Sequence, residues 1–183
     1  EHVAGIVLTA PLQALARLHT AAAAGLVADG ALGRPRRPGE ESLELTDLGA
    51  APPAQEVAAR LRDVADVLVA VPSLPVVVAA AVVHAELATV RPFVRGNAVV
   101  ARALDRAVVR AGGLDPTGVA VTEGGHAAGG GAAYLGALAA YGRGDAVGVG
   151  LWISHCCDAV RAAATQGEAV ADAVLAGRLG PPT

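Results

Sequence analysis

Residues 75–90 are apolar on almost every side of a helix and lie between prolines. Pro75 suits a first helical turn, whereas Arg91-Pro92 ends the segment because proline lacks an N–H and restricts the residue before it. A helix without a polar face must be covered all round, which predicts a central helix. The overlapping apolar run 67–83 is at the short limit for a membrane span and contains two prolines. A buried core helix, and no membrane span, is therefore the interpretation that we favour.

Further segments have the apolar spacing of helices and end at glycine or proline. Residues 42–46 alternate polar and apolar side chains, as a short strand does. Residues 33–48 are therefore predicted to form a small β-hairpin or an extended flap. We predict one all-α domain over residues 1–183, with its core at about 11–164 and helices 75–90 and 98–111 at its centre. The predicted helices are 11–24, 54–68, 75–90, 98–111, 132–141, 147–165 and 168–176, with a loop over 115–131.

The composition excludes several classes of protein. Of the 183 residues, 54% are hydrophobic and 17% charged, which argues against intrinsic disorder. The net charge of −3 argues against a globally basic nucleic-acid binder, and the 2% of aromatic residues against a base-stacking surface. Cys156 and Cys157 are adjacent and give no disulfide framework, so we expect a reducing cytoplasm.

The segment Arg91 to Arg102, RPFVRGNAVVAR, carries the strongest chemical signal. Gly96-Asn97 is predicted to start a helix after a chain reversal, and the free N–H groups of a helix start attract anions. Arg95 lies in the turn and Arg102 about one turn into the helix. A phosphate or carboxylate site is one interpretation. An ordinary turn and cap, with solvated or paired arginines, is the other.

This segment resembles the signature of the Fic (Fido) family, HPFx[DE]GNGRxxR, which follows a helix that often carries a histidine, here His84. Residues 133–138 resemble the YxxAL helix of the family, and 144–153 resemble its gap followed by WI. The resemblance covers about residues 11–164 and implies a Fic-type helical domain with a flap. The matching signature positions are Pro92, Phe93, Gly96, Asn97 and Arg102.

The resemblance also implies an activity. Fic proteins modify protein hydroxyls, usually by transferring AMP from ATP to Ser, Thr or Tyr. In the family the motif histidine is the general base, the acidic residue holds Mg²⁺, the GNG backbone forms an anion hole, and two arginines stabilise the phosphate charge. The partners implied are a nucleotide and a protein target.

This sequence departs from the signature at four positions, Arg91, Arg95, Ala98 and Val99. Arg91 stands where the general base would be, and a guanidinium stays protonated and accepts no proton. Arg95 stands where the carboxylate ligand would be, and its charge would repel Mg²⁺. We therefore expect ATP or another nucleotide as ligand, no metal ligands, and weak or no adenylyl transfer. The expected phosphate-binding residues are Arg95, Gly96, Asn97, Ala98 and Arg102.

Two alternatives stay open from the sequence. The chain could be a non-catalytic interaction module that binds a protein partner through the flap at residues 34–46. It could also be an active transferase whose base lies elsewhere, at His84 or His126. His155-Cys156-Cys157 is a poor metal motif, because consecutive helical positions point about 100° apart and three ligands fall short of a structural zinc site's four.

Overall fold

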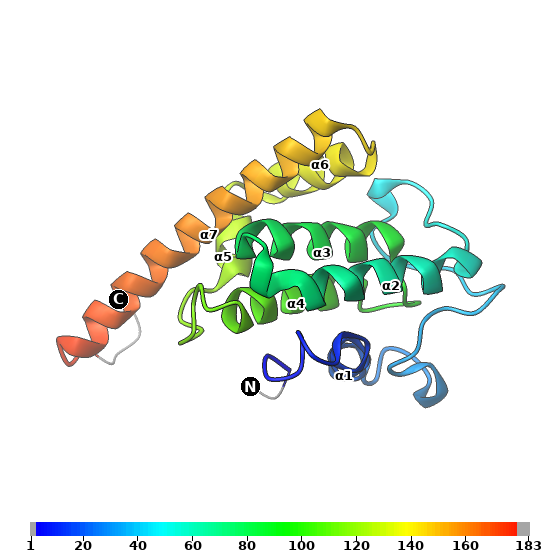
Figure 1. The fold of residues 1–183 in the computed structure, drawn as a ribbon, viewed down its shortest axis with the longest axis horizontal. Coiled ribbons are helices and arrows are strands. Elements are labelled where there is room, and N and C mark those ends of the chain that lie inside the picture. The colour runs from blue at the N-terminus through cyan, green and yellow to red at the C-terminus, as the bar shows by residue number, and fades with distance from the viewer. Residues whose placement is uncertain (1–2, 179–183) are drawn as a thin grey trace.

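The computed structural model describes residues 3–178, which form seven α-helices and three short 3-10 turns without a β-strand (Figure 1). The all-α prediction is confirmed. The helices are α1 (Pro11–Ala23), α2 (Ala54–Ala70), α3 (Val76–Val90), α4 (Asn97–Ala111), α5 (Thr122–Ala128), α6 (Gly131–Gly142) and α7 (Ala146–Leu175). The 3-10 turns are η1 (Asp29–Ala31), η2 (Thr46–Leu48) and η3 (Val71–Ser73).

Helix α3 is the central helix and contributes to two hydrophobic clusters. On one side it packs with α1, α2 and α4 around large side chains such as Leu68, Leu87 and Leu104. On the other side its small residues, Ala81, Ala85 and Ala88, face α6 and α7. Figure 1 shows α7 as a long diagonal helix across this second side, with α1 at the opposite side of the molecule. Burial on both sides explains why residues 75–90 carry no polar face.

The structure corrects the C-terminal part of the helix prediction. Helix α7, Ala146–Leu175, is one continuous helix where two helices, 147–165 and 168–176, were predicted. Gly167 is buried, and a Cβ there would lie 3.1 Å from Val119 Cγ1, so tertiary packing favours a glycine inside the helix. The predicted loop 115–131 contains α5, a helix of 7 residues with two glycines. A Cβ at Gly125 would lie 1.9 Å from the Ala159 carbonyl oxygen, so α5 and α7 touch through their backbones.

The prediction of a β-hairpin over residues 33–48 is wrong, because none of these residues lies in a strand. The alternating residues 42–46 pair with no neighbouring strand and run into η2 after Leu45, which has a left-handed φ of 54°. The flap instead bonds to the chain after α3. Arg36 N–H donates to the Pro92 carbonyl at 2.7 Å, and Leu43 N–H to the Val94 carbonyl at 2.9 Å.

Within residues 3–178, none of the helices combines the length and the apolar character needed to cross a membrane. Cys156 is buried, Cys157 is exposed, and both are free thiols.

Candidate functional site

The turn between α3 and α4, residues 91–96, begins and ends in the left-handed region. Arg91 caps α3 with φ 47°, and Gly96 precedes α4 with φ 85°. The predicted helix 98–111 placed Asn97 just before the helix. In the structure Asn97 is the first residue of α4, and Gly96 is the residue that precedes it. The Asn97 side chain accepts from Phe93 N–H at 2.9 Å and donates to the Phe93 carbonyl at 2.8 Å. These two bonds fix the turn, and Asn97 Nδ2 also reaches Ser42 Oγ of the flap at 3.3 Å.

Arg91 is buried and turned toward the end of the flap. Its guanidinium donates to the carbonyls of Leu45 and Gly49, at 2.9 and 2.8 Å. Arg36 is the second buried arginine here, and its Nε donates to the Arg91 carbonyl at 2.7 Å. Burial lowers the pKa of Arg91, and the nearby charge of Arg36 lowers it further. Arg91 thus holds residues 45–49 against the end of α3.

The N–H of Gly96 already holds an anion from the flap. It donates to Glu44 Oε1 at 2.7 Å, so a carboxylate lies at the start of α4, where the helix dipole favours negative charge. The other carboxylate oxygen, Oε2, is buried and has no hydrogen-bond partner. Sequence analysis missed Glu44, because only the path of the flap brings it to the turn.

The remaining motif arginines lie in different surroundings. The side chain of Arg95 is exposed, while its carbonyl is bonded to His19 Nε2 at 3.1 Å. Arg102 lines a cavity of about 260 Å³ between α4, α5 and α6, together with Glu123, His126 and Tyr134. Within residues 3–178 neither guanidinium makes an ion pair. Ala98 is half-buried in the first turn of α4.

The histidines that the sequence left unconnected meet beside this cavity. His84 Nε2 lies 2.8 Å from the Tyr134 hydroxyl, and His126 Nδ1 lies 3.2 Å from His155 Nε2. Trp152 packs against all four of these rings, those of His84, His126, Tyr134 and His155. Burial lowers the pKa of His84 to about 3, so its imidazole is neutral at pH 7. The pKa of His155 is also lowered, first by burial and then by the neighbouring His126.

Asp105 completes this cluster from α4. It is 3% exposed, and its Oδ2 lies 3.8 Å from His126 Nε2. His84, Asp105 and His126 offer ligand atoms that all lie within 4.8 Å of one another, an arrangement that could hold a metal ion. Sequence analysis considered His84 and His126 only as separate candidate bases and missed Asp105. The three residues lie on different helices, and no local spacing connects them.

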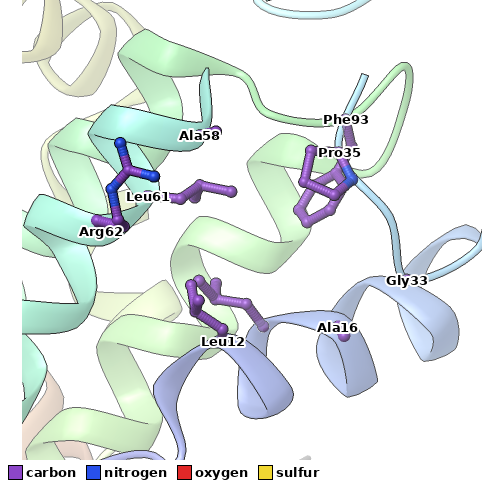
Figure 2. A pocket seen from close by; sticks show the side chains of 9 residues that line it. Leu12, Ala16, Gly33, Pro35, Ala58, Leu61, Arg62 and Phe93 are labelled. Atoms are coloured by element: carbon purple, nitrogen blue, oxygen red, sulfur yellow. The ribbon is translucent and has the colours of Figure 1, made fainter. Parts of the chain in front are cut away.

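A second cavity, of about 430 Å³, lies between α1, α2 and the start of the flap. Figure 2 shows Leu12 and Ala16 of α1 opposite Leu61 and Arg62 of α2, with Pro35 beside Phe93. The lining is mostly apolar, and Leu12 is 48% exposed. This cavity is distinct from the one that Arg102 lines.

Comparison with known proteins places the chain in a family. The family model described as Fic/DOC family matches residues 9–107, which include α1 to α3, the flap, the turn after α3 and most of α4. No curated protein matches the chain. The matched region is more than half of the sequence and includes residues 91–102. The chain therefore belongs to the Fic/DOC family.

Proposed function

We propose that this Fic-fold protein binds a phosphate-bearing ligand, ATP or another nucleotide, at the start of α4, and that it has weak or no adenylyl-transfer activity. The proposed contacts are the α4 start, Gly96 to Ala98, with Arg95 and Arg102. The observation that carries the proposal is the bond between Gly96 N–H and the Glu44 carboxylate. A turn that holds a carboxylate has the chemistry to hold a phosphate oxygen.

Two features of the turn argue against Mg²⁺-dependent transfer of AMP. Arg91 cannot accept a proton from a target hydroxyl, and its guanidinium is bonded to the carbonyls of Leu45 and Gly49. Loss of a general base forfeits a rate factor of ~10²–10⁴. Arg95 supplies a positive charge where the family places a carboxylate ligand, so it opposes the binding of Mg²⁺ and favours direct contact with phosphate.

Ligand binding at this turn has to compete with Glu44. A phosphate that accepts the hydrogen bond from Gly96 N–H must displace the Glu44 carboxylate. Displacement also frees Glu44 Oε2 from a buried position in which it has no hydrogen-bond partner, which lowers the cost of displacement. Arg95 and Arg102, which make no ion pair within the described residues, are available to the incoming charge. The proposal therefore predicts that Glu44→Gln strengthens phosphate binding.

The test is a thermal-shift measurement with ATP, ADP, AMP and phosphate, with and without Mg²⁺. A ligand at about 100 times its Kd adds ~2.7 kcal/mol of stability, which gives a clear rise in Tm. We expect a rise that does not need Mg²⁺, that is larger in Glu44→Gln, and that is lost when Arg95→Ala and Arg102→Ala are combined. Arg17→Ala, an exposed arginine on α1, is the matched control. No rise at saturating ligand would overturn the proposal.

Residual transfer activity is measured with α-labelled ATP and candidate protein targets. We expect little or no label on protein. If label does appear, His84→Gln and His126→Gln test whether either ring acts as the base. Label that persists in His84→Gln and His126→Gln but disappears in Gly96→Ala would show that the turn itself supports transfer. That result would contradict our expectation of weak or no adenylyl transfer.

A second candidate function is that of a non-catalytic interaction module, and the apolar cavity beside the flap favours it (Figure 2). This candidate predicts no response to nucleotide and a protein partner that contacts α1 and the flap. Binding would then be lost in Leu12→Asp and on replacement of residues 34–46, and retained in the Arg95→Ala, Arg102→Ala double variant.

A further inference from the structure

A buried cluster of side chains with metal-binding chemistry lies where α3, α4 and α5 meet. His84 from α3, Asp105 from α4 and His126 from α5 each place one ligand atom in a common space, with every pair of atoms within 4.8 Å. The three side chains are 0%, 3% and 4% exposed. We call these residues the His84–Asp105–His126 cluster.

Two atoms of the cluster, His84 Nδ1 and Asp105 Oδ2, are buried and have no hydrogen-bond partner. His126 Nε2 lies 3.8 Å from Asp105 Oδ2, beyond hydrogen-bond distance. We take these three atoms as the ligand atoms of the cluster. A buried carboxylate oxygen without a partner is costly, and native proteins rarely leave one. A cation between the three atoms would satisfy all of them together.

The other nitrogen of each histidine ring is already fixed. His84 Nε2 lies 2.8 Å from the Tyr134 hydroxyl, and His126 Nδ1 lies 3.2 Å from His155 Nε2. Histidines that bind metals use the second ring nitrogen in this way, which sets the tautomer and the ring orientation. When Nε2 of His84 carries the proton and donates to Tyr134, Nδ1 presents a lone pair to the cluster.

We propose that the His84–Asp105–His126 cluster binds a divalent transition-metal ion of the zinc or iron(II) class. Two imidazoles and one carboxylate are a donor set that suits these ions. Ligand bonds of about 2.0–2.2 Å place neighbouring donors roughly 3–3.5 Å apart, whereas the cluster atoms lie within 4.8 Å of one another, so metal binding has to draw the three side chains together by up to ~1–2 Å. This site differs in residues and in position from the Mg²⁺ site that the family signature implies, and it does not depend on the phosphate proposal.

The cavity beside the cluster provides access for a small ligand. His126 lines this cavity of about 260 Å³ together with Arg102, Glu123 and Tyr134. Three protein ligands leave at least one coordination position open, as in metal sites that bind a water molecule or a substrate. Arg102, next to that position, favours a small anion such as a carboxylate or phosphate as the exchangeable ligand.

The test uses the full chain after treatment with a chelator and dialysis. Co²⁺ is titrated while visible absorption is recorded, and Zn²⁺ is then added as a competitor. We expect d–d absorption bands that saturate at one Co²⁺ per chain, displacement of Co²⁺ by Zn²⁺, and a higher Tm with either ion. Absence of the bands and of any Tm change with both ions in excess would overturn the proposal.

Variants then assign the ligands. Asp105→Asn keeps the shape of the side chain and removes a buried charge, so the metal-free variant is expected to fold with a Tm no lower than that of the original chain. Its Co²⁺ affinity is expected to fall by ~100-fold or more, since even the loss of a residue that only hydrogen-bonds to a metal ligand costs about 10–100-fold. His126→Gln is the second ligand variant. Cys157→Ser and Asp158→Asn, at exposed positions on α7, are the controls for adventitious binding and should bind Co²⁺ normally. Unchanged affinity in Asp105→Asn and His126→Gln would overturn the assignment.

Discussion

The two arginines of the turn, Arg91 and Arg95, should affect stability very differently. Arg91 is buried and donates to the carbonyls of Leu45 and Gly49 at 2.9 and 2.8 Å. Arg95 is exposed, and its guanidinium makes no ion pair within residues 3–178. We predict that Arg91→Ala destabilises the fold and that Arg95→Ala does not.

The magnitude follows from the bonds that are lost. A hydrogen bond to a charged group contributes about 1.5–3 kcal/mol, and the low end applies because both carbonyls are only partly buried. Two such bonds give about 3 kcal/mol. In Arg91→Ala, water can hydrate the two carbonyls, and the cost of burying the guanidinium disappears. Both effects reduce the net loss in the free energy of unfolding to about 2 kcal/mol. For a chain of this size, about 2–4 °C per kcal/mol gives a fall in Tm of roughly 4–8 °C.

Thermal and urea unfolding of both variants measure this difference. Arg95→Ala should lie within about 0.5 kcal/mol of the original chain, as is usual for an exposed position. Limited proteolysis should cut residues 42–52 faster in Arg91→Ala, because the flap loses its attachment to the end of α3. Equal Tm values for the two variants, or an unchanged proteolysis rate in Arg91→Ala, would refute the structural role assigned to Arg91.

Three further predictions test the packing and the buried histidines. Gly125→Ala should lower the free energy of unfolding, measured by chemical denaturation, by ~2–3 kcal/mol or more, because the new Cβ would lie 1.9 Å from the Ala159 carbonyl oxygen. Gly136→Ala on α6 is the control; its Cβ would have no atom within 4 Å, so this change should be neutral or stabilising. Trp152→Phe should lower stability by ~1–2 kcal/mol, because the buried indole N–H loses its 2.7 Å bond to a carbonyl of α3; a smaller loss would mean that the bond contributes little. The pKa of His19 is lowered below 6.5, mainly by burial, so the folded state binds fewer protons than the unfolded state and the stability present above pH 6.5 should decline as pH falls below it. An NMR titration midpoint above 6.5 would contradict that assignment.

Much of the fold could be predicted from local patterns. The bounds of α1 and α4 follow from Pro11 at a helix start and from Gly112 at a helix end, and lie within a residue or two of prediction. Where the helix prediction failed, in α5 and α7, glycine was the reason. Gly124 and Gly125 in α5 and Gly167 in α7 have low helix propensity, yet each lies where a neighbouring element comes close. Close packing compensates for the low helix propensity of these glycines. That packing involves residues far apart in the chain, so it could not be predicted from the sequence.

The prediction of a β-hairpin in the flap failed for a different reason. The alternation over residues 42–46 is real, but a strand needs a partner strand, and none of the described residues supplies one. The flap bonds instead to the turn after α3, through Arg36 and Leu43 N–H groups. The alternation predicted a strand, whereas Leu45 is left-handed and Thr46 begins η2, because the bonds that the flap makes depend on the tertiary fold.

The sequence alone determined the helical class, the central place of residues 75–90, the turn at Gly96-Asn97 and the family resemblance, because each depends on residues close together in the chain. The tertiary structure decided what surrounds the turn: that Glu44 lies on Gly96 N–H and that Arg91 binds carbonyls of residues 45 and 49. It also decided that His84, Asp105 and His126 meet, since they come from three helices. Burial and charge at a site depend on which distant segments pack together, and hydrophobic periodicity fixes the face of each helix but not its neighbour.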